Sequence, residues 1–157
     1  MIKVGETLPE VTFQQVNNGK IEDLTTPQIF SGKKAIIFAV PGAFTPTCSQ
    51  KHLPGFVHLY NKLQEKGIDI IACTAVNDAY TMQAWQKALA AENIVMLADG
   101  GANFAKALGV DKDTGIFGGT RSKRYALVVN DTIIEHIFLE QPGEFSVSNA
   151  EAILTIL

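Results

Sequence analysis

Cys48 is the residue of this sequence that is best placed to do chemistry. It ends the segment PGAFTPTC, residues 41–48, which lies between an apolar segment and an amphipathic one. A cysteine at the start of a helix lies near free backbone N–H groups and the positive end of the helix dipole, and both favour the thiolate. Because a thiolate is a nucleophile and is readily oxidised, the position predicts a reactive cysteine.

The residues before Cys48 add groups that a reactive thiolate can use. Thr45 and Thr47 each carry a hydroxyl that can donate to a thiolate or accept from a substrate. Pro41 stiffens the exit from the preceding strand and can shelter the thiol from water. The alternative is a buried structural thiol, since free cysteine is often buried. The Pro-Gly and Thr-Pro pairs argue against it, because loops of this kind lie at the surface.

His52 raises a second chemical hypothesis, a hydrolase with a Cys–His pair. It follows Cys48 by four residues, which places both side chains on one face of a regular helix. A catalytic pair also needs a third residue to orient the histidine, and side chains at this spacing lean along the helix instead. We therefore expect His52 to support the helix or to make a partly buried polar contact. His58 and His136 have no neighbours that suggest a ligand set.

The composition describes one globular domain over residues 1–157. Of its residues 46% are apolar and 18% are charged, which argues against disorder. The net charge is −3 without a basic tract, and no apolar run has transmembrane length, so we expect neither a nucleic-acid nor a membrane partner. The first residues lack the apolar core of a signal peptide, which predicts a soluble, cytoplasmic protein. With two cysteines, we expect no metal and no other cofactor.

Strands alternate with helices along most of the chain. Three apolar segments have the pattern of strands covered on both faces: 35–40, 68–76 and 94–98. The helices expected around them run over 26–32, from Cys48 to about Lys66, from a cap at Asn77 or Asp78 onward, and over 102–108. Pro54 lies inside the second of these helices and predicts a kink there.

The two ends of the chain complete the pattern. A weak strand is expected over 11–16, a turn over 17–20, a Gly-, Asp- and Lys-rich loop over 111–123, a hairpin of 124–129 with 132–139, and a capping box at 148–151 before a last helix. These elements predict an α/β protein with a mixed central sheet, helices on both faces and an N-terminal β extension. A thioredoxin-like sandwich is such an arrangement.

The segment around Cys48 closely resembles the peroxidatic loop of type II peroxiredoxins, the peroxiredoxin-5 group. Pro41, Thr45 and Cys48 match the family's P-x-x-x-T-x-x-C pattern, and Ser49 and the run HLPGF from His52 also agree. Further segments resemble the family over nearly all of the chain: 4–9, 73–78, 99–104, 122–125 and 143–157. The resemblance implies a thioredoxin-like fold and a thiol peroxidase that serves cell redox homeostasis.

The resemblance also implies roles for single residues. Cys48 would be the peroxidatic cysteine, whose thiolate attacks one oxygen of hydrogen peroxide or a small alkyl hydroperoxide and becomes a sulfenic acid. Thr45 would hydrogen-bond the thiolate and position the peroxide. Pro41 would shield the sulfenic acid from over-oxidation.

A basic cluster, Arg121, Lys123 and Arg124, precedes a predicted strand. Most such clusters are solvated, and from the residues alone Arg121 is as good a candidate as Arg124 for a place beside Cys48. The family's match to Ser-Lys-Arg-Tyr selects Arg124, which would stabilise the thiolate and the charge on the separating oxygens. A guanidinium keeps its charge and presents several donors in one plane, which suits that role.

The second cysteine bears on how the enzyme is reduced. Cys73 lies in a covered strand and is interpreted as a small buried residue, so that a cycle through it would need local opening. Some family members carry a resolving cysteine near the C-terminus, but residues 143–148 contain none. The resemblance thus implies a one-cysteine cycle in which glutathione, with glutaredoxin, reduces the sulfenic acid through a mixed disulfide. Thioredoxin stays open as the electron donor.

Three further expectations concern the surroundings of the site. Phe44 and Phe117 are predicted to form an apolar rim around the substrate, with Thr47 as a polar contact. The family implies a homodimer. A peroxide sensor or chaperone, which would act through a protein partner, and the Cys–His hydrolase remain as competing functions.

Overall fold

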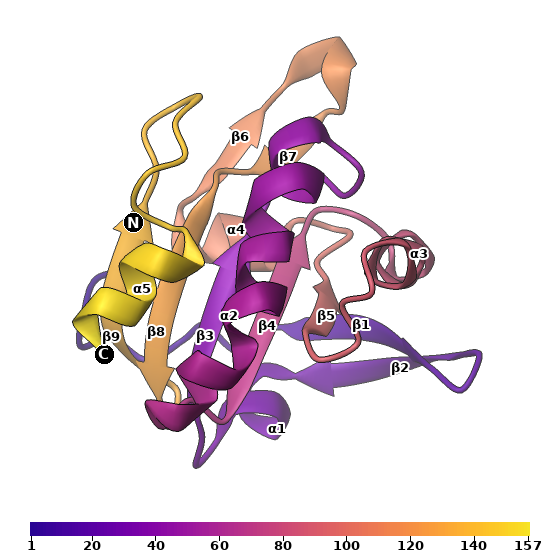
Figure 1. Ribbon diagram of the computed structural model, residues 1–157. Coiled ribbons are helices and arrows are strands. Elements are labelled where there is room, and N and C mark those ends of the chain that lie inside the picture. Colours follow the sequence, from indigo (N-terminus) through magenta and orange to yellow (C-terminus); the bar gives the residue numbers. More distant parts are fainter.

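The computed structural model describes all residues from 1 to 157 and contains a seven-stranded mixed sheet (Figure 1). Its strands are β1 (Thr12–Asn17), β2 (Lys20–Thr25), β3 (Lys34–Ala39), β4 (Ile70–Ala75), β5 (Val95–Ala98), β8 (Tyr125–Asn130) and β9 (Ile133–Leu139). Their order is β2-β1-β5-β4-β3-β8-β9, in which β3, β4 and β5 are parallel and the outer strands are antiparallel. The predicted mixed sheet and its N-terminal β extension are confirmed.

Helices cover both faces of this sheet. They are α1 (Thr26–Phe30), α2 (Leu53–Glu65), α3 (Ala79–Ala88), α4 (Asn103–Leu108) and α5 (Ala150–Ile156). One apolar core joins α2, α3 and α5 to one face, and a second joins α1 and α4 to the other. Side chains of β3 alternate between the cores, with Ile36 and Phe38 in the first and Ile37 in the second. Because both faces are covered, the strand is apolar throughout, as its sequence predicted.

Three short strands differ from the prediction because none of them contains a buried apolar residue. β2 follows the predicted turn and pairs with all of β1, although its side chains are mostly exposed. Residues 111–123, predicted as a loop, form a hairpin of β6 (Asp111–Asp113) and β7 (Thr120–Ser122) around a 3₁₀ turn, Gly115–Phe117. Exposed strands lack the apolar alternation by which strands are recognised in a sequence.

The helix expected from Cys48 to Lys66 divides into two parts. Residues Cys48–His52 form a π-helical turn in which the N–H of Leu53 donates to the carbonyl of Cys48, and α2 begins at Leu53. Pro54 therefore lies in the first turn of α2, directly after the π-helical turn. The predicted regular helix is wrong, because a π-helical turn is wider than an α-helical one. The kink predicted at Pro54 stays a prediction.

The last helix is capped by a different residue from the one predicted. Asn149, and not Ser148, is the N-cap of α5, and its side chain accepts a hydrogen bond of 2.7 Å from the N–H of Ala152. The capping box predicted at 148–151 is wrong because the hydroxyl of Ser148 donates instead to the carboxylate of Glu140, at 2.7 Å.

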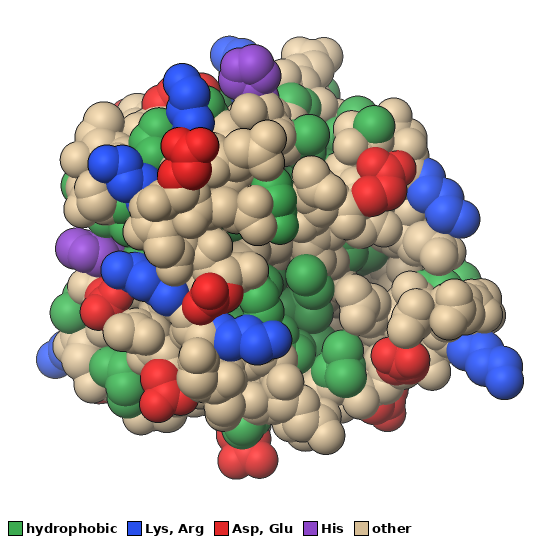
Figure 2. Space-filling view, turned by 60° about the horizontal axis from the view of Figure 1, so that its bottom comes forward, with side chains coloured by type: hydrophobic (Ala, Val, Ile, Leu, Met, Phe, Trp, Pro, Cys, Tyr) green, Lys and Arg blue, Asp and Glu red, His purple; other side chains and the backbone are tan.

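Charges of both signs are scattered on the face drawn in Figure 2, around a shallow hollow where hydrophobic side chains gather. Neither sign forms a broad patch on that face, so it offers no strong field for a charged macromolecule. None of the helices combines the length and the apolar character that crossing a bilayer requires.

Candidate active site

The antiparallel pairing of β3 and β8 brings the chemically important residues together. Tyr125 lies opposite Ala39 in this pair, so Arg124 lies beside the carboxyl end of β3. The loop after β3 leads directly to Cys48, whose side chain is fully buried. The sheet thus places the cationic side chain of Arg124 next to the buried sulfur of Cys48, although the two residues are 76 positions apart in the chain.

Arg124 makes two hydrogen bonds with the π-helical turn. Its Nη2 donates to Sγ of Cys48 at 3.1 Å, and its Nη1 contacts Nδ1 of His52 at 2.9 Å. Because the guanidinium is a rigid planar fork, fixing one of its nitrogens also fixes the other. His52 therefore determines where the charge of Arg124 lies relative to the sulfur.

His52 is neutral and fully buried. Burial, and next the charge of Arg124, lower the pKa of His52 from 6.5 to about 3. A guanidinium can only donate, so Nδ1 accepts from Arg124, and Nε2 carries the proton and donates to the carbonyl of Ser148 at 3.0 Å. Both ring nitrogens are engaged, and His52 is not placed to act as the base of a Cys–His hydrolase.

Glu140 holds the segment that carries Ser148. Its carboxylate accepts from the N–H groups of Ser146 and Val147 at 2.9 Å, and from Ser148 N–H at 2.8 Å and the Ser148 hydroxyl at 2.7 Å. Burial opposes ionisation here, but the bonds from Ser146 and Ser148 outweigh it, and the pKa of Glu140 is lowered from its usual value. The Ser148 carbonyl is thereby held where His52 donates to it.

Aromatic rings enclose the same group of residues. The rings of Phe38 and His52 lie 4.9 Å apart, and the ring of Phe145 lies 5.0 Å from His52. The guanidinium carbon of Arg124 is 5.7 Å from the centre of the Phe145 ring, within the range of a cation–π contact. These rings cover part of the guanidinium and all of the buried imidazole, and a less polar surrounding strengthens the bonds between them.

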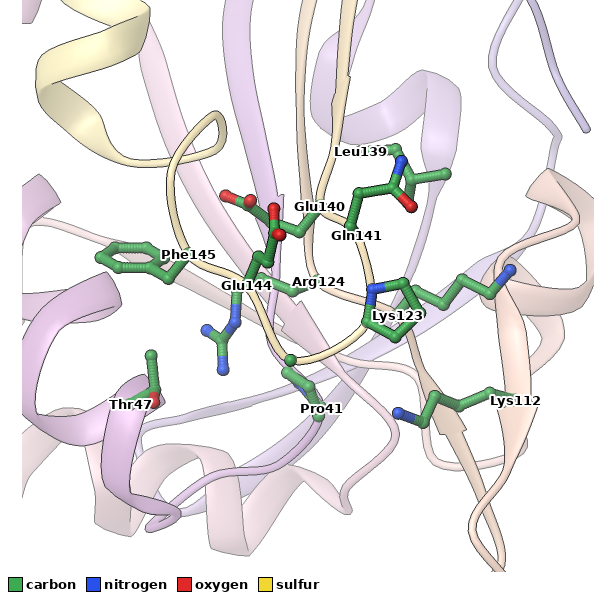
Figure 3. A pocket seen from close by; sticks show the side chains of 12 residues that line it. Pro41, Thr47, Lys112, Lys123, Arg124, Leu139, Glu140, Gln141, Glu144 and Phe145 are labelled. Atoms are coloured by element: carbon green, nitrogen blue, oxygen red, sulfur yellow. The ribbon is translucent and has the colours of Figure 1, made fainter.

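A cavity of about 310 Å³ adjoins this group (Figure 3). Pro41, Thr47 and Arg124 line it on the side nearest the buried sulfur, and Lys112 and Lys123 lie across from Thr47. Since Arg124 both lines the cavity and bonds to Cys48, a small ligand in the cavity reaches the charged group next to the sulfur.

Comparison with known proteins agrees with this geometry. The family model described as Redoxin matches residues 3–154. Peroxiredoxin-2E-2, chloroplastic, of Oryza sativa subsp. japonica is 44% identical over 165 residues, which cover 99% of this chain and 72% of that protein. The chain belongs to the redoxin family. It is a peroxiredoxin, and so a thiol peroxidase, an oxidoreductase.

Solved structures of other peroxiredoxins have the same fold. Reduced Prx3 of Vibrio vulnificus in complex with H₂O₂ is 49% identical, with a TM-score of 0.98 and 99% of each chain covered. Peroxiredoxin 5 of Alvinella pompejana is 36% identical, with a TM-score of 0.87 and coverage of 99% of this chain and 97% of that one. The thioredoxin-type sandwich expected from the resemblance is therefore confirmed.

The structure separates the two arginines that the residues alone left equal. In this peroxiredoxin Arg124 bonds to Cys48, whereas Arg121 donates to the carbonyls of Val76 at 2.9 Å and Gly118 at 3.1 Å. Arg121 thus fastens the β6–β7 hairpin to the end of β4, and its guanidinium is engaged away from the sulfur.

Thr45 is arranged differently from the expectation. Its hydroxyl donates to the carbonyl of Gly42 at 2.6 Å and does not donate to the sulfur of Cys48. The reason is local, because the tight turn of residues 42–45 places that carbonyl within reach of the hydroxyl. The oxygen of Thr45 keeps its lone pairs free to accept a hydrogen bond from a ligand.

Two predicted rim residues lie outside the cavity lining. Phe44 is 56% exposed and Phe117 is 73% exposed, and the cavity is lined by neither. Phe44 also has a φ of +64°, which is uncommon for a bulky residue. Their contact with substrate stays a prediction.

Cys73 is a buried residue of β4, in the same apolar core as Cys48. Burial, and next the charge of Cys48, raise the pKa of Cys73 well above its usual value, so its thiol is protonated at neutral pH.

Sequence reasoning missed Glu140 and the link between His52 and Arg124. The signal available for Glu140 was a single carboxylate at the end of an apolar strand, followed by Pro-Gly and two serines. The contact predicted for His52 proves to be a fully buried one, because the histidine bonds to two groups distant in the sequence.

Proposed function

We propose that this peroxiredoxin reduces hydrogen peroxide and small alkyl hydroperoxides through the thiolate of Cys48. The observation that carries the proposal is the hydrogen bond of 3.1 Å from Arg124 to the buried sulfur. A full positive charge beside a fully buried sulfur stabilises an anion more than it would in solvent. No second cation or metal is needed to hold the sulfur as a nucleophile.

The chemical step follows from the groups around the sulfur. The thiolate attacks one peroxide oxygen, the S–O bond forms as the O–O bond breaks, and the other oxygen leaves as water or an alcohol after taking a proton. Arg124 stabilises the negative charge that develops on both oxygens. Because its own proton is given to Gly42, the Thr45 hydroxyl accepts from the peroxide O–H and orients it. Pro41 limits access to the sulfenic acid that results.

The relative from Vibrio vulnificus supports hydrogen peroxide as a substrate. That chain is 49% identical to this one and its crystal structure is a complex of the reduced protein with H₂O₂. Its fold agrees with this one over 99% of both chains, which supports an equivalent position for the peroxide here.

We propose a one-cysteine cycle for the return to the thiolate. Cys73 is protonated and fully buried in a central strand, and the chain has no third cysteine. An external thiol therefore attacks the sulfur of the Cys48 sulfenic acid, the S–O bond breaks, and water leaves with formation of a mixed disulfide. A second thiol then attacks the mixed disulfide, which releases the Cys48 thiolate and leaves the disulfide on the donor. We propose that glutathione, with glutaredoxin, supplies this thiol. Thioredoxin is the alternative donor.

Peroxide consumption by the purified protein tests both parts. We expect turnover with glutathione and glutaredoxin, no turnover for Cys48→Ser, and undiminished turnover for Cys73→Ser. Equal rates for wild type and Cys48→Ser would end the peroxidase proposal. Loss of turnover in Cys73→Ser at unchanged stability would end the one-cysteine cycle, and faster turnover with thioredoxin would make that protein the donor.

We also propose that the protein is a homodimer that pairs through the loops around the site. Tyr80, Ile116, Phe117 and Phe44 are large apolar side chains that are more than half exposed. The segments that carry these side chains lie close together. Ala43 N–H, next to Phe44, donates to the side chain of Asn77, just before α3, at 2.9 Å, and Arg121 joins the β6–β7 hairpin to the end of β4. Burying such a cluster favours association.

The solution mass by light scattering tests the dimer. We expect twice the chain mass for wild type and a monomer for Ile116→Lys/Phe117→Glu, with the matched control Ile21→Lys, another exposed apolar residue, unchanged. A monomeric wild type would contradict the proposal.

A further inference from the structure

We propose that Lys112 and Lys123 bind the carboxylates of an anionic peptide thiol, the class that includes glutathione, while its sulfur reduces Cys48. This inference rests on the proposed function, since it names how the reductant is held in the cavity beside the peroxidatic cysteine.

The hairpin places the two lysines as a pair. Lys112 lies opposite Arg121 in the β6–β7 register, and the N–H of Lys123 extends the ladder by donating to Val110 at 2.8 Å. Lys112 and Lys123 are therefore diagonal neighbours on one face of the hairpin. The hairpin is itself anchored by Arg121, so their position relative to Cys48 is set by the fold.

Both ammonium groups are free to bind an anion. The one ion pair of the structure is between Lys34 and Glu135, at 3.7 Å, and both lysines of the cavity are exposed. Of the carboxylates in the lining, Glu140 is already satisfied by backbone and hydroxyl donors. Two unpaired like charges at one wall repel each other, and an anion between them relieves that repulsion.

The charges of the lining complement those of a γ-glutamyl peptide thiol. Such a thiol carries two carboxylates and one ammonium group, which matches the two lysines and the exposed carboxylate of Glu144 across the cavity. In the close-up, Lys112 and Lys123 lie on the side opposite Thr47; the ammonium of Lys112 points toward Pro41, and that of Lys123 points away from it (Figure 3). A ligand held by the lysines thus has its remaining end directed to the Arg124 side, where the sulfur lies.

The cavity offers polar partners to a small peptide thiol. Its volume of about 310 Å³ is at the lower end of the range for small-molecule sites. Its lining contains two large apolar side chains, Leu139 and Phe145, and is otherwise polar or charged apart from two prolines and a glycine. The carboxylates and amides of a peptide thiol therefore find hydrogen-bond and charge partners there.

The reduction step balances without any further reactant. The thiol sulfur attacks the sulfur of the Cys48 sulfenic acid, an S–S bond forms and the S–O bond breaks. The oxygen leaves as water with the thiol proton and the sulfenic acid proton. The thiol sulfur is oxidised and the Cys48 sulfur is reduced, which yields the mixed disulfide.

The test isolates this step from the rest of the cycle. Wild type is oxidised with one equivalent of hydrogen peroxide and mixed with glutathione or with its diethyl ester, in which both carboxylates are masked. The reaction is then quenched, and the mixed disulfide is measured by mass spectrometry. The variant is Lys112→Glu/Lys123→Glu, and the matched control is Lys20→Glu/Lys66→Glu, which reverses two exposed lysines outside the lining.

We expect the variant to react with glutathione roughly five- to tenfold more slowly than wild type, the size of two exposed charge pairs. Its rate with the diethyl ester should not fall below that of wild type, because the carboxylates that the lysines bind are masked. The control should match wild type with both thiols, and added salt should slow wild type with glutathione toward the variant. An equal loss with both thiols, or no loss with glutathione, overturns the proposal.

Two further readouts separate the alternatives. If hydrogen peroxide leaves Cys48 of wild type unoxidised, the proposed function fails; if it oxidises Cys48 and the lysines prove irrelevant, only this inference fails. The oxidation step is repeated with linoleic acid hydroperoxide and its methyl ester. A loss in the lysine variant that is confined to oxidation by the free acid would assign the lysines to a carboxylated substrate and overturn their assignment to the reductant.

Discussion

Arg124 and His52 form the contact on which the site depends, through the bond of 2.9 Å between Nη1 and Nδ1. The same guanidinium bonds to Cys48, and the other nitrogen of His52 bonds to the carbonyl of Ser148. The carboxylate of Glu140 in turn accepts hydrogen bonds from the N–H and the hydroxyl of Ser148. The position of the positive charge beside the sulfur is thus fixed by a continuous series of hydrogen bonds from the C-terminal part of the chain.

Substitution of Arg124 should impair oxidation even when the charge is kept. Arg124→Lys retains a cation but cannot bridge Cys48 and His52, because an ammonium is a point charge without the planar fork. We expect the second-order rate with hydrogen peroxide to fall about 100-fold for Arg124→Lys and further for Arg124→Gln. Stopped-flow fluorescence of Trp85, which donates to Ser49 next to Cys48 at 2.9 Å, measures it.

Arg121 supplies the matched control for that experiment. It belongs to the same basic cluster, but bonds to backbone carbonyls away from the sulfur. Arg121→Lys should stay within about threefold of the wild-type rate, since charge on the hairpin acts only from a distance. Equal losses at the two positions would mean that Arg124 acts through general charge and not through its contacts.

His52 should act through the orientation of Arg124. His52→Leu removes both hydrogen bonds, whereas His52→Gln can still offer an oxygen to Arg124 and an N–H to Ser148. We expect about a 10- to 100-fold slower reaction with peroxide for the leucine variant and partial recovery for the glutamine variant. Alkylation of Cys48 by iodoacetamide at pH 7 should follow the same order. A leucine variant as fast as wild type would refute the role.

The buried neutral imidazole makes stability dependent on pH. The pKa of His52 is about 3 in the folded state, below the unfolded value of 6.5, so the unfolded chain binds the extra proton. Stability should therefore be full above pH 6.5 and decrease as the pH falls, by about 2 kcal/mol between pH 7 and pH 5. Urea unfolding of wild type and His52→Gln measures it, and the variant should lose this dependence. An equal slope in both would contradict the assignment.

Glu140 should stabilise the segment that follows it. Glu140→Gln leaves one acceptor oxygen for the donors of Ser146, Val147 and Ser148, so the buried N–H and hydroxyl of Ser148 compete with the other two for it. We expect a loss of about 2–3 kcal/mol in the free energy of unfolding at pH 7. Hydrogen exchange should increase over residues 141–149. Glu144→Gln, an exposed carboxylate of the same loop, is the control and should leave stability unchanged.

Much of the fold could be predicted from the sequence because the buried strands are apolar and the helices are amphipathic. Cys48 was recognisable for a similar reason, since the prolines and threonines of its loop are consecutive in the chain. The exposed hairpin of β6 and β7 was not predictable from apolar spacing, as its strands contain no buried apolar residue.

The rest of the site depends on contacts between residues far apart in the sequence. Arg124 and His52 are 72 residues apart, and His52 and Ser148 are 96 apart. The residue types alone could not select Arg124 over Arg121, because the choice depends on the register of β8 against β3, and it was the family resemblance that made it. The π-helical turn could not be predicted for another reason, which is that the residues Cys48–His52 also fit a regular α-helix.

The rate at which hydrogen peroxide oxidises Cys48 to the sulfenic acid tests the central claim most directly. It is measured at pH 7 in Cys73→Ser, in which Cys48 is the one remaining sulfhydryl, with Cys48→Ser/Cys73→Ser as the blank. The account predicts rapid oxidation of Cys48 that is lost in Arg124→Gln. Oxidation that is as slow in the presence of Arg124 as in Arg124→Gln would contradict it.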